Sequence, residues 1–234
     1  MKKLLLILPV LLLLSCGQKI EGTRITVKAA NYDADHVMLG WLEAGSYKNT
    51  QVTLKNGKGE ITVDLPDRTV VAMSSADPRA SIKMGNEGRI PSVRFEFYAE
   101  RGHHVKISFD ADSWPELSIS GSRLNDDVNI YWNSMAPLMA RSYAVTRQML
   151  RYMNVRDGVP PTDDAAKLQD EMLGVQRDFI AGHPGSILSA DLLRNSFRQF
   201  SPAEAQLLFN AMSEEVRESD SGVALAGMIG SIHD

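Results

Sequence analysis

Apolar residues alternate with polar ones over much of the first half of the chain, between Arg24 and Gly121. A period of two is typical of strands that bury one face. Turn-forming residues separate these segments at spacings of about 8 to 12 residues, which favours an antiparallel β-sandwich or a partly open barrel. Because the connections are too short for crossover helices, the pattern disfavours parallel pairing. The alternating sets are Ile25, Val27 and Ala29; Val37, Leu39 and Trp41; Val52 and Leu54; Ile61, Val63 and Leu65; Val93, Phe95 and Phe97; and Val105, Ile107 and Phe109.

The period changes after Gly121, where apolar residues begin to recur every three or four positions. This spacing predicts a long amphipathic helix, which Pro137 is expected to kink or split. A second helix is expected from Thr162 towards Gly182. The chain is therefore predicted to be an α+β protein, with a β domain over residues 24–121 followed by an α-helical domain over residues 122–234.

Two further helices are expected near the C-terminus of the chain. Ser201 precedes Pro202 and stands three residues before Glu204, a spacing that predicts an N-terminal cap closed by a capping box. The last segment, from Ser221 to Ile232, is expected to form one more short helix.

The first residues have the layout of a bacterial lipoprotein signal. Lys2 and Lys3 precede an apolar run over residues 4–14, and the small residue Ser15 stands directly before Cys16. The run is shorter than the roughly 20 apolar residues that a spanning helix needs. We therefore expect residues 1–15 to be a signal peptide, cleaved after Ser15, and Cys16 to become a lipidated N-terminus. A secretory signal followed by a coincidental cysteine is the alternative.

Residues 16–23 would then form a short lipidated tether to the domain. No aspartate stands beside Cys16, which favours the outer membrane over retention in the inner one. The predicted location is the cell envelope, with the domain facing the periplasm and membrane lipid as the partner of Cys16. Two acyl chains turn marginal membrane binding into stable anchoring.

Composition narrows the chemistry that this chain can perform. Cys16 is the only cysteine in 234 residues, so the chain can form no internal disulfide and no dithiol pair. Acidic residues exceed basic ones by 29 to 25, which argues against nucleic acid as a partner. Motifs of serine hydrolases, phosphate-binding loops and zinc proteases are absent. Adjacent His103 and His104 on a strand would face opposite sides, so no metal or other cofactor is expected.

A stripe of methionine and aromatic residues runs along the first predicted helix. Tyr131, Trp132, Met135 and Met139 are candidate contacts for a partner protein, because thioethers and aromatic rings make adaptable docking surfaces. Core packing is the simpler interpretation of these positions, and a Cu(I) site built from thioethers is a third.

Several short stretches of the chain form a familiar set. They are Phe95–Gly102, Ser120–Asp126, His183–Ser186 with Ser189, Ala190 and Leu193, and Ser201 with Glu204 and Ala205. These stretches resemble the N-terminal domain of unknown function that, in a group of Gram-negative lipoproteins, usually precedes a TlpA-like, thioredoxin-like thiol-disulfide oxidoreductase domain. The resemblance implies a thioredoxin-like redox protein as a partner. The domain that carries the Cys-x-x-Cys pair in such proteins would begin near the point where this chain stops.

Three functional hypotheses follow. The first is a lipid-anchored, non-catalytic envelope module associated with periplasmic thiol-disulfide redox proteins. The second is the leading part of a thiol-disulfide oxidoreductase whose catalytic domain has been separated from it. The third is a lipoprotein that binds a glycan or peptide, with Trp41 or Trp114 as a stacking platform.

Overall fold

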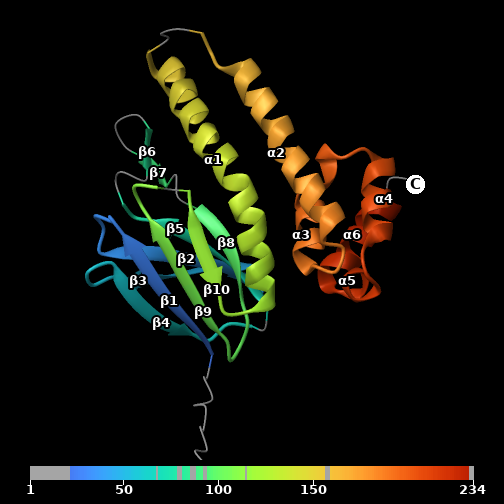
Figure 1. The fold of residues 1–234 in the computed structure, drawn as a ribbon, viewed down its shortest axis with the longest axis horizontal. Coiled ribbons are helices and arrows are strands. Elements are labelled where there is room, and N and C mark those ends of the chain that lie inside the picture. Colours follow the sequence, from blue (N-terminus) through green and yellow to red (C-terminus); the bar gives the residue numbers. More distant parts are fainter. Residues whose placement is uncertain are drawn as a thin grey trace, which may run out of the picture.

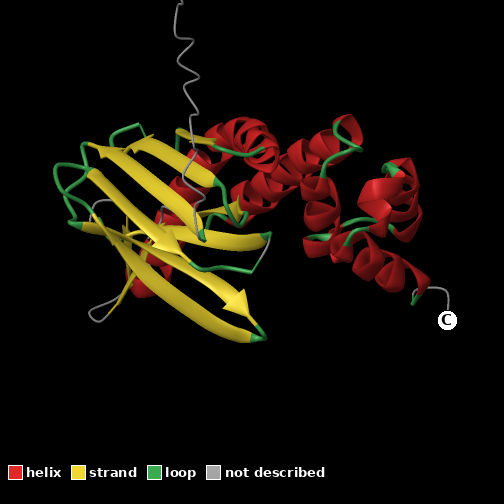
Figure 2. Ribbon diagram, turned by 90° about the horizontal axis from the view of Figure 1, so that it is seen from below, coloured by secondary structure: helices red, strands yellow, loops and turns green. Residues whose placement is uncertain are grey.

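The computed structural model describes residues 22–231 except 67, 78–80, 85–87, 92–93, 114 and 156–158. The predicted signal peptide, Ser15 and Cys16 lie outside the described residues. Two four-stranded sheets form the N-terminal part, and helices follow, which confirms the α+β prediction (Figures 1 and 2). The sheets are not closed into a barrel.

The two sheets differ in strand order. In the first sheet the order is β10 (Leu117–Ser120), β9 (His104–Asp110), β1 (Thr23–Ala30) and β4 (Lys58–Val63). In the second sheet the order is β3 (Ser46–Thr53), β2 (His36–Glu43), β5 (Thr69–Ser75) and β8 (Arg94–Ala99). A separate hairpin consists of β6 (Ser81–Met84) and β7 (Gly88–Pro91).

The core between the sheets follows the alternation in the sequence. Ile25 and Val27 of β1 face Leu39, Met73 and Phe97 of the second sheet, and all five side chains are buried. Polar or small residues occupy most of the positions between them. The hydrophobic effect therefore selects the register of each strand, since a shift by one residue would expose its whole apolar set.

One pairing differs from the expectation. β1 pairs with β9 in parallel, with Ile25 opposite Val105 and Val27 opposite Ile107, whereas the other strand pairs are antiparallel. The prediction considered only connections between strands adjacent in the sequence. Between β1 and β9 the chain builds the second sheet and β4, so this long route supplies the crossover that parallel strands require.

The helical part begins directly after β10. Gly121 connects the two at a φ of +119°, and a Cβ there would lie 2.0 Å from the carbonyl oxygen of His104, so only glycine fits. The helices are α1 (Arg123–Val155), α2 (Thr162–Gly182), α3 (Ile187–Asn195), α4 (Pro202–Ala211), α5 (Glu214–Glu218) and α6 (Asp220–Gly230), with a 3₁₀ helix at Phe197–Gln199. Within the described ranges no helix is both long and apolar enough to cross a membrane.

Two local expectations need correction. Pro137 does not split the first helix, because α1 is continuous through it. Pro137 and Asn133 are both exposed, so the carbonyl of Asn133, which lacks its usual N–H partner, faces water. At α4 the capping box is only half formed: Ser201 accepts from the N–H of Glu204, but the carboxylate of Glu204 binds Arg177 of α2 instead.

Helix α1 closes the open side of the sandwich. It contacts β8 at the edge of one sheet and β10 at the edge of the other (Figure 1). Asn125 bonds to the backbone of β8, and Asn129, one helical turn later, accepts from the N–H of Ile119 on β10 at 3.0 Å. One helix thus bonds to both strand edges, at one residue of each, through two side chains on the same face.

Two hydrophobic clusters hold the chain together. The first fills the sandwich and includes Val128 of α1, Phe179 of α2 and Leu188 of α3, so the helices contribute to the same core as the strands. The second lies among α2 to α6, which gather at the C-terminal end of α2 in Figure 1.

Candidate functional site

A cavity of about 510 Å³ lies between β8, α1 and α3. We call it the aromatic cleft. Its size falls within the range of about 300 to 1,000 Å³ that is usual for ligand sites. The apolar residues that line it include Phe95, Phe97, Tyr131, Trp132, Met139 and Leu192.

The rings of the cleft are held by contacts behind them. Trp132 donates its indole N–H to the carbonyl of Pro115 at 2.7 Å, and its ring centroid lies 5.9 Å from that of Phe95. Tyr131 packs edge to face against Phe179 of α2 at 5.3 Å. These contacts fix the orientation of the wall, so a partner would meet a preformed surface.

The structure brings together three of the four predicted contact residues. Tyr131, Trp132 and Met139 line the aromatic cleft, and Tyr143 joins them from the same helix. Met135 is only 6% exposed and does not line the cleft. It lies three and four residues from Trp132 and Tyr131, but the helix turns its side chain inward.

A buried polar network forms the floor beside the cleft. The hydroxyl of Tyr98 donates to Oδ2 of Asp191 at 2.5 Å, and the hydroxyl of Ser221 donates to Oδ1 at 2.5 Å. Arg194 pairs with the same carboxylate at 3.0 Å and donates to Ser221 at 3.2 Å. The network joins β8, α3 and α6 and satisfies the buried carboxylate.

Sequence reasoning missed this network, although one signal was present. Phe95 and Phe97 fill the inward positions of β8, so Tyr98 belongs on the outward face, where a large buried aromatic needs cover from another element. Asp191 is likewise the single charged residue in the buried set of α3, among Leu188, Ala190 and Leu193. A tyrosine and an aspartate that each interrupt an apolar pattern are therefore candidates to form a hydrogen bond with each other.

Burial controls the ionisation of the two tyrosines at the cleft. It raises the pKa of Tyr98 far above the ordinary value of 10, and the charge of Asp191 raises it further. Burial also raises the pKa of Tyr131 to about 12. Both phenols therefore stay protonated well above pH 10, and Tyr98 donates its proton in the hydrogen bond to Asp191.

Tyr98→Phe should reduce the loss of folding stability that the protein undergoes at alkaline pH. The folded protein holds the phenol proton above pH 10 whereas the unfolded chain releases it, so stability falls as the pH rises past about 10, by up to about 1.4 kcal/mol per pH unit for one tyrosine. Urea unfolding of wild type and variant at about pH 9 and pH 11 measures this. Identical losses in both proteins would show that Tyr98 ionises freely in the fold.

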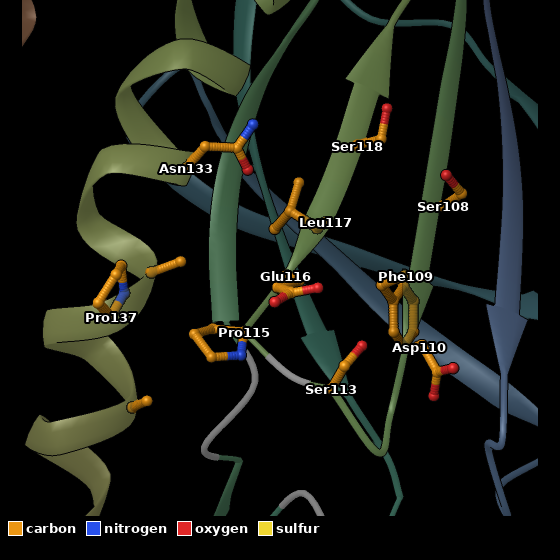
Figure 3. Close-up of a pocket in the computed structure, with 12 residues that line it drawn as sticks. Ser108, Phe109, Asp110, Ser113, Pro115, Glu116, Leu117, Ser118, Asn133 and Pro137 are labelled. Atoms are coloured by element: carbon orange, nitrogen blue, oxygen red, sulfur yellow. The ribbon is translucent and has the colours of Figure 1, made fainter.

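A wider hollow of about 950 Å³ lies between β9, β10 and the middle of α1. Figure 3 shows Ser108 and Ser118 on the strands, Pro137 and Asn133 on the helix, and Glu116 between them. All five residues are exposed. No buried polar group points into this hollow among those that Figure 3 labels, and we therefore regard the aromatic cleft as the better candidate site.

The remaining candidates have local roles. His104 bonds through Nε2 to the hydroxyl of Thr26 at 2.7 Å, and His103 is exposed. No cluster of three or more histidine, cysteine, aspartate or glutamate side chains that could hold a metal occurs in the described part of the chain. Trp41 packs against the sandwich core, which weakens its case as a stacking platform, and Trp114 lies outside the described residues.

No protein-family model, no curated protein and no solved structure matches this chain. The resemblance to the N-terminal domain of thioredoxin-associated lipoproteins remains an expectation, and a functional proposal has to start from the geometry of the aromatic cleft.

Proposed function

We propose that the protein is a lipid-anchored binding module of the cell envelope, non-catalytic by itself, whose aromatic cleft receives a partner protein. The cleft carries the proposal: aromatic rings held by contacts behind them form its wall, and the polar network of Tyr98, Asp191 and Arg194 adjoins it. The carboxylate oxygens of Asp191 already accept from Tyr98 and Ser221. Such a carboxylate is engaged in structure and is poorly placed to act as a general base.

The proposed partner is a thioredoxin-like thiol-disulfide redox protein. Two observations support this choice. The resemblance stated above links this type of domain to thioredoxin-like ones, and the chain has no second cysteine with which to perform dithiol exchange itself. We infer that such a module positions or recognises a separate redox protein.

Site-specific photo-crosslinking tests the partner. A benzophenone amino acid at Met139 in the cleft should capture a protein with a thioredoxin fold and a Cys-x-x-Cys pair in envelope preparations. The matched control places the same probe at Leu207 of α4, which is 69% exposed and lies outside the cleft. Equal capture at both positions, or no redox protein at Met139, would contradict the proposal.

Cys16→Ser should release the protein from the membrane without unfolding it. The lipid would be attached outside the described domain, whose first strand begins at Thr23, so the circular dichroism spectrum should stay unchanged while nearly all the protein moves to the soluble fraction. Ser15→Ala is the control, because it keeps a small residue before the cysteine and should stay membrane-bound. An unchanged membrane fraction for Cys16→Ser would refute lipid anchoring.

A further inference from the structure

Strand β8 is the last strand of its sheet, so one of its edges has no neighbouring strand in the part of the chain that the structure describes. In an antiparallel pair, the N–H and C=O of one residue point to the same side, and the side changes with each residue. At Tyr98 both groups point away from β5. The N–H of Tyr98 donates to Oδ1 of Asn125 at 2.9 Å, and its C=O accepts from Nδ2 at 2.8 Å.

The same geometry applies two and four residues earlier, at Glu96 and Arg94. Their N–H and C=O groups also point away from β5, which they face across the register at Ala72 and Ser74. Among the described residues, no side chain or strand bonds to the outward N–H and C=O of Glu96 and Arg94 in the way that Asn125 bonds to those of Tyr98. The edge of β8 is thus closed at one end and open along the rest.

The open edge faces the aromatic cleft. The five consecutive residues Arg94–Tyr98 all line that cavity, opposite Tyr131 and Trp132 of α1. A ligand in the cleft therefore meets aromatic rings on one side and unpaired backbone donors and acceptors on the other. An extended peptide satisfies both, because its backbone pairs with the edge while alternate side chains point towards the rings.

We propose that the aromatic cleft binds an extended segment of the partner protein, which joins β8 as a fifth strand and ends against Asn125. This rests on the proposed function and specifies the chemistry of the bound partner. Two residues of β8 offer two donors and two acceptors, so the added strand would span about four residues. A helix could not serve, since its own backbone groups are already bonded within it.

The test compares Glu96→Pro with Glu96→Ala in the released Cys16→Ser protein. Proline removes the outward N–H of an edge strand, a position where it is tolerated, whereas alanine removes only the side chain. The probe is an octapeptide selected from a random library for binding to the parent protein. Only a peptide that loses binding to the Trp132→Ala variant is used, because such a peptide binds in the aromatic cleft. Glu96→Ala should keep its affinity within about twofold, and Glu96→Pro should weaken it at least about tenfold.

Backbone methylation of the peptide gives a second readout that does not depend on how Glu96→Pro folds. Methylating the peptide nitrogens one at a time should abolish binding at alternate positions only. Equal affinities of the two Glu96 variants, or methylation effects without alternation, would overturn the inference. So would a dimer of the parent protein that Glu96→Pro dissociates, because the edge would then belong to a second copy of the chain.

The two proposals fail separately. If Met139 captures a redox protein but the Glu96 variants bind alike, the strand-addition inference is wrong and the proposed function stands. If the peptide readouts succeed but no redox protein is captured, strand addition is supported and the identity of the partner is wrong.

Discussion

Phe97→Ala should lower the free energy of unfolding by about 3 to 5 kcal/mol, the usual cost of removing a buried phenylalanine ring. The side chain is 1% exposed at the centre of the sandwich, and its ring lies 6.3 Å from that of Phe95. Neighbouring strands cannot close the resulting space without breaking their ladders, so much of the cavity should persist. Urea unfolding at neutral pH measures the difference, provided that the m-value is unchanged.

Leu42→Ala is the matched control in the same sheet. Leu42 lies on the outward face of β2 and is 69% exposed, so its loss should change stability by less than about 0.5 kcal/mol. A loss below about 1 kcal/mol for Phe97→Ala would mean that the inner and outer faces of β8 have been assigned the wrong way round.

Most strands that the sequence predicts place apolar residues at their buried positions and polar ones between them, as Ile107 and Phe109 of β9 do on either side of Ser108. β5 was not predicted, because its inward positions include the polar residues Thr69 and Ser75 and its outward positions include the apolar Val70, which is partly exposed. The contrast between the faces is therefore weak, although Val71 and Met73 are fully buried. Period-two reasoning depends on contrast, and a central strand with small polar residues at its ends lacks it.

Helix α3 escaped prediction for a different reason. It is only nine residues long, and its buried set includes Ser189 and Asp191 beside leucines and an alanine. These polar residues bond to groups outside the helix: Ser189 donates to the carbonyl of His183, just before α3, and Asp191 accepts from the distant Tyr98 and Ser221. A buried polar residue signals its environment only when its partner is known.

One wall of the candidate site could be predicted from the sequence. A helical period places Tyr131, Trp132 and Met139 on neighbouring faces of one helix, and the structure has all three at the cleft. The same period could not tell that Met135 would turn into the core, since the direction of a helix face depends on the tertiary contacts of the helix. The opposite wall, from β8, required knowledge of which strand lies at the sheet edge.

Asn125 fixes how helix α1 packs against the edge of strand β8. Its side chain is fully buried and presents a carbonyl and an amide in the geometry of a backbone peptide unit, so that it replaces a neighbouring strand for one residue of β8. Gly121 brings α1 into place within four residues of this contact. Gly121 thus ends the first sheet, and Asn125 closes the edge of the second at Tyr98.

Asn125→Ala should therefore cost about 2 to 6 kcal/mol of unfolding free energy, because it leaves both the N–H and the C=O of Tyr98 buried without a partner, at about 1 to 3 kcal/mol for each unsatisfied group. Asn129→Ala is the matched control one turn later. It removes a single bond, to the N–H of Ile119, from a half-buried residue, and should cost about 1 kcal/mol. Chemical unfolding of both variants measures the difference. If the two losses were equal, water would have to reach the edge of β8 at Tyr98, and Asn125 would not be what closes it.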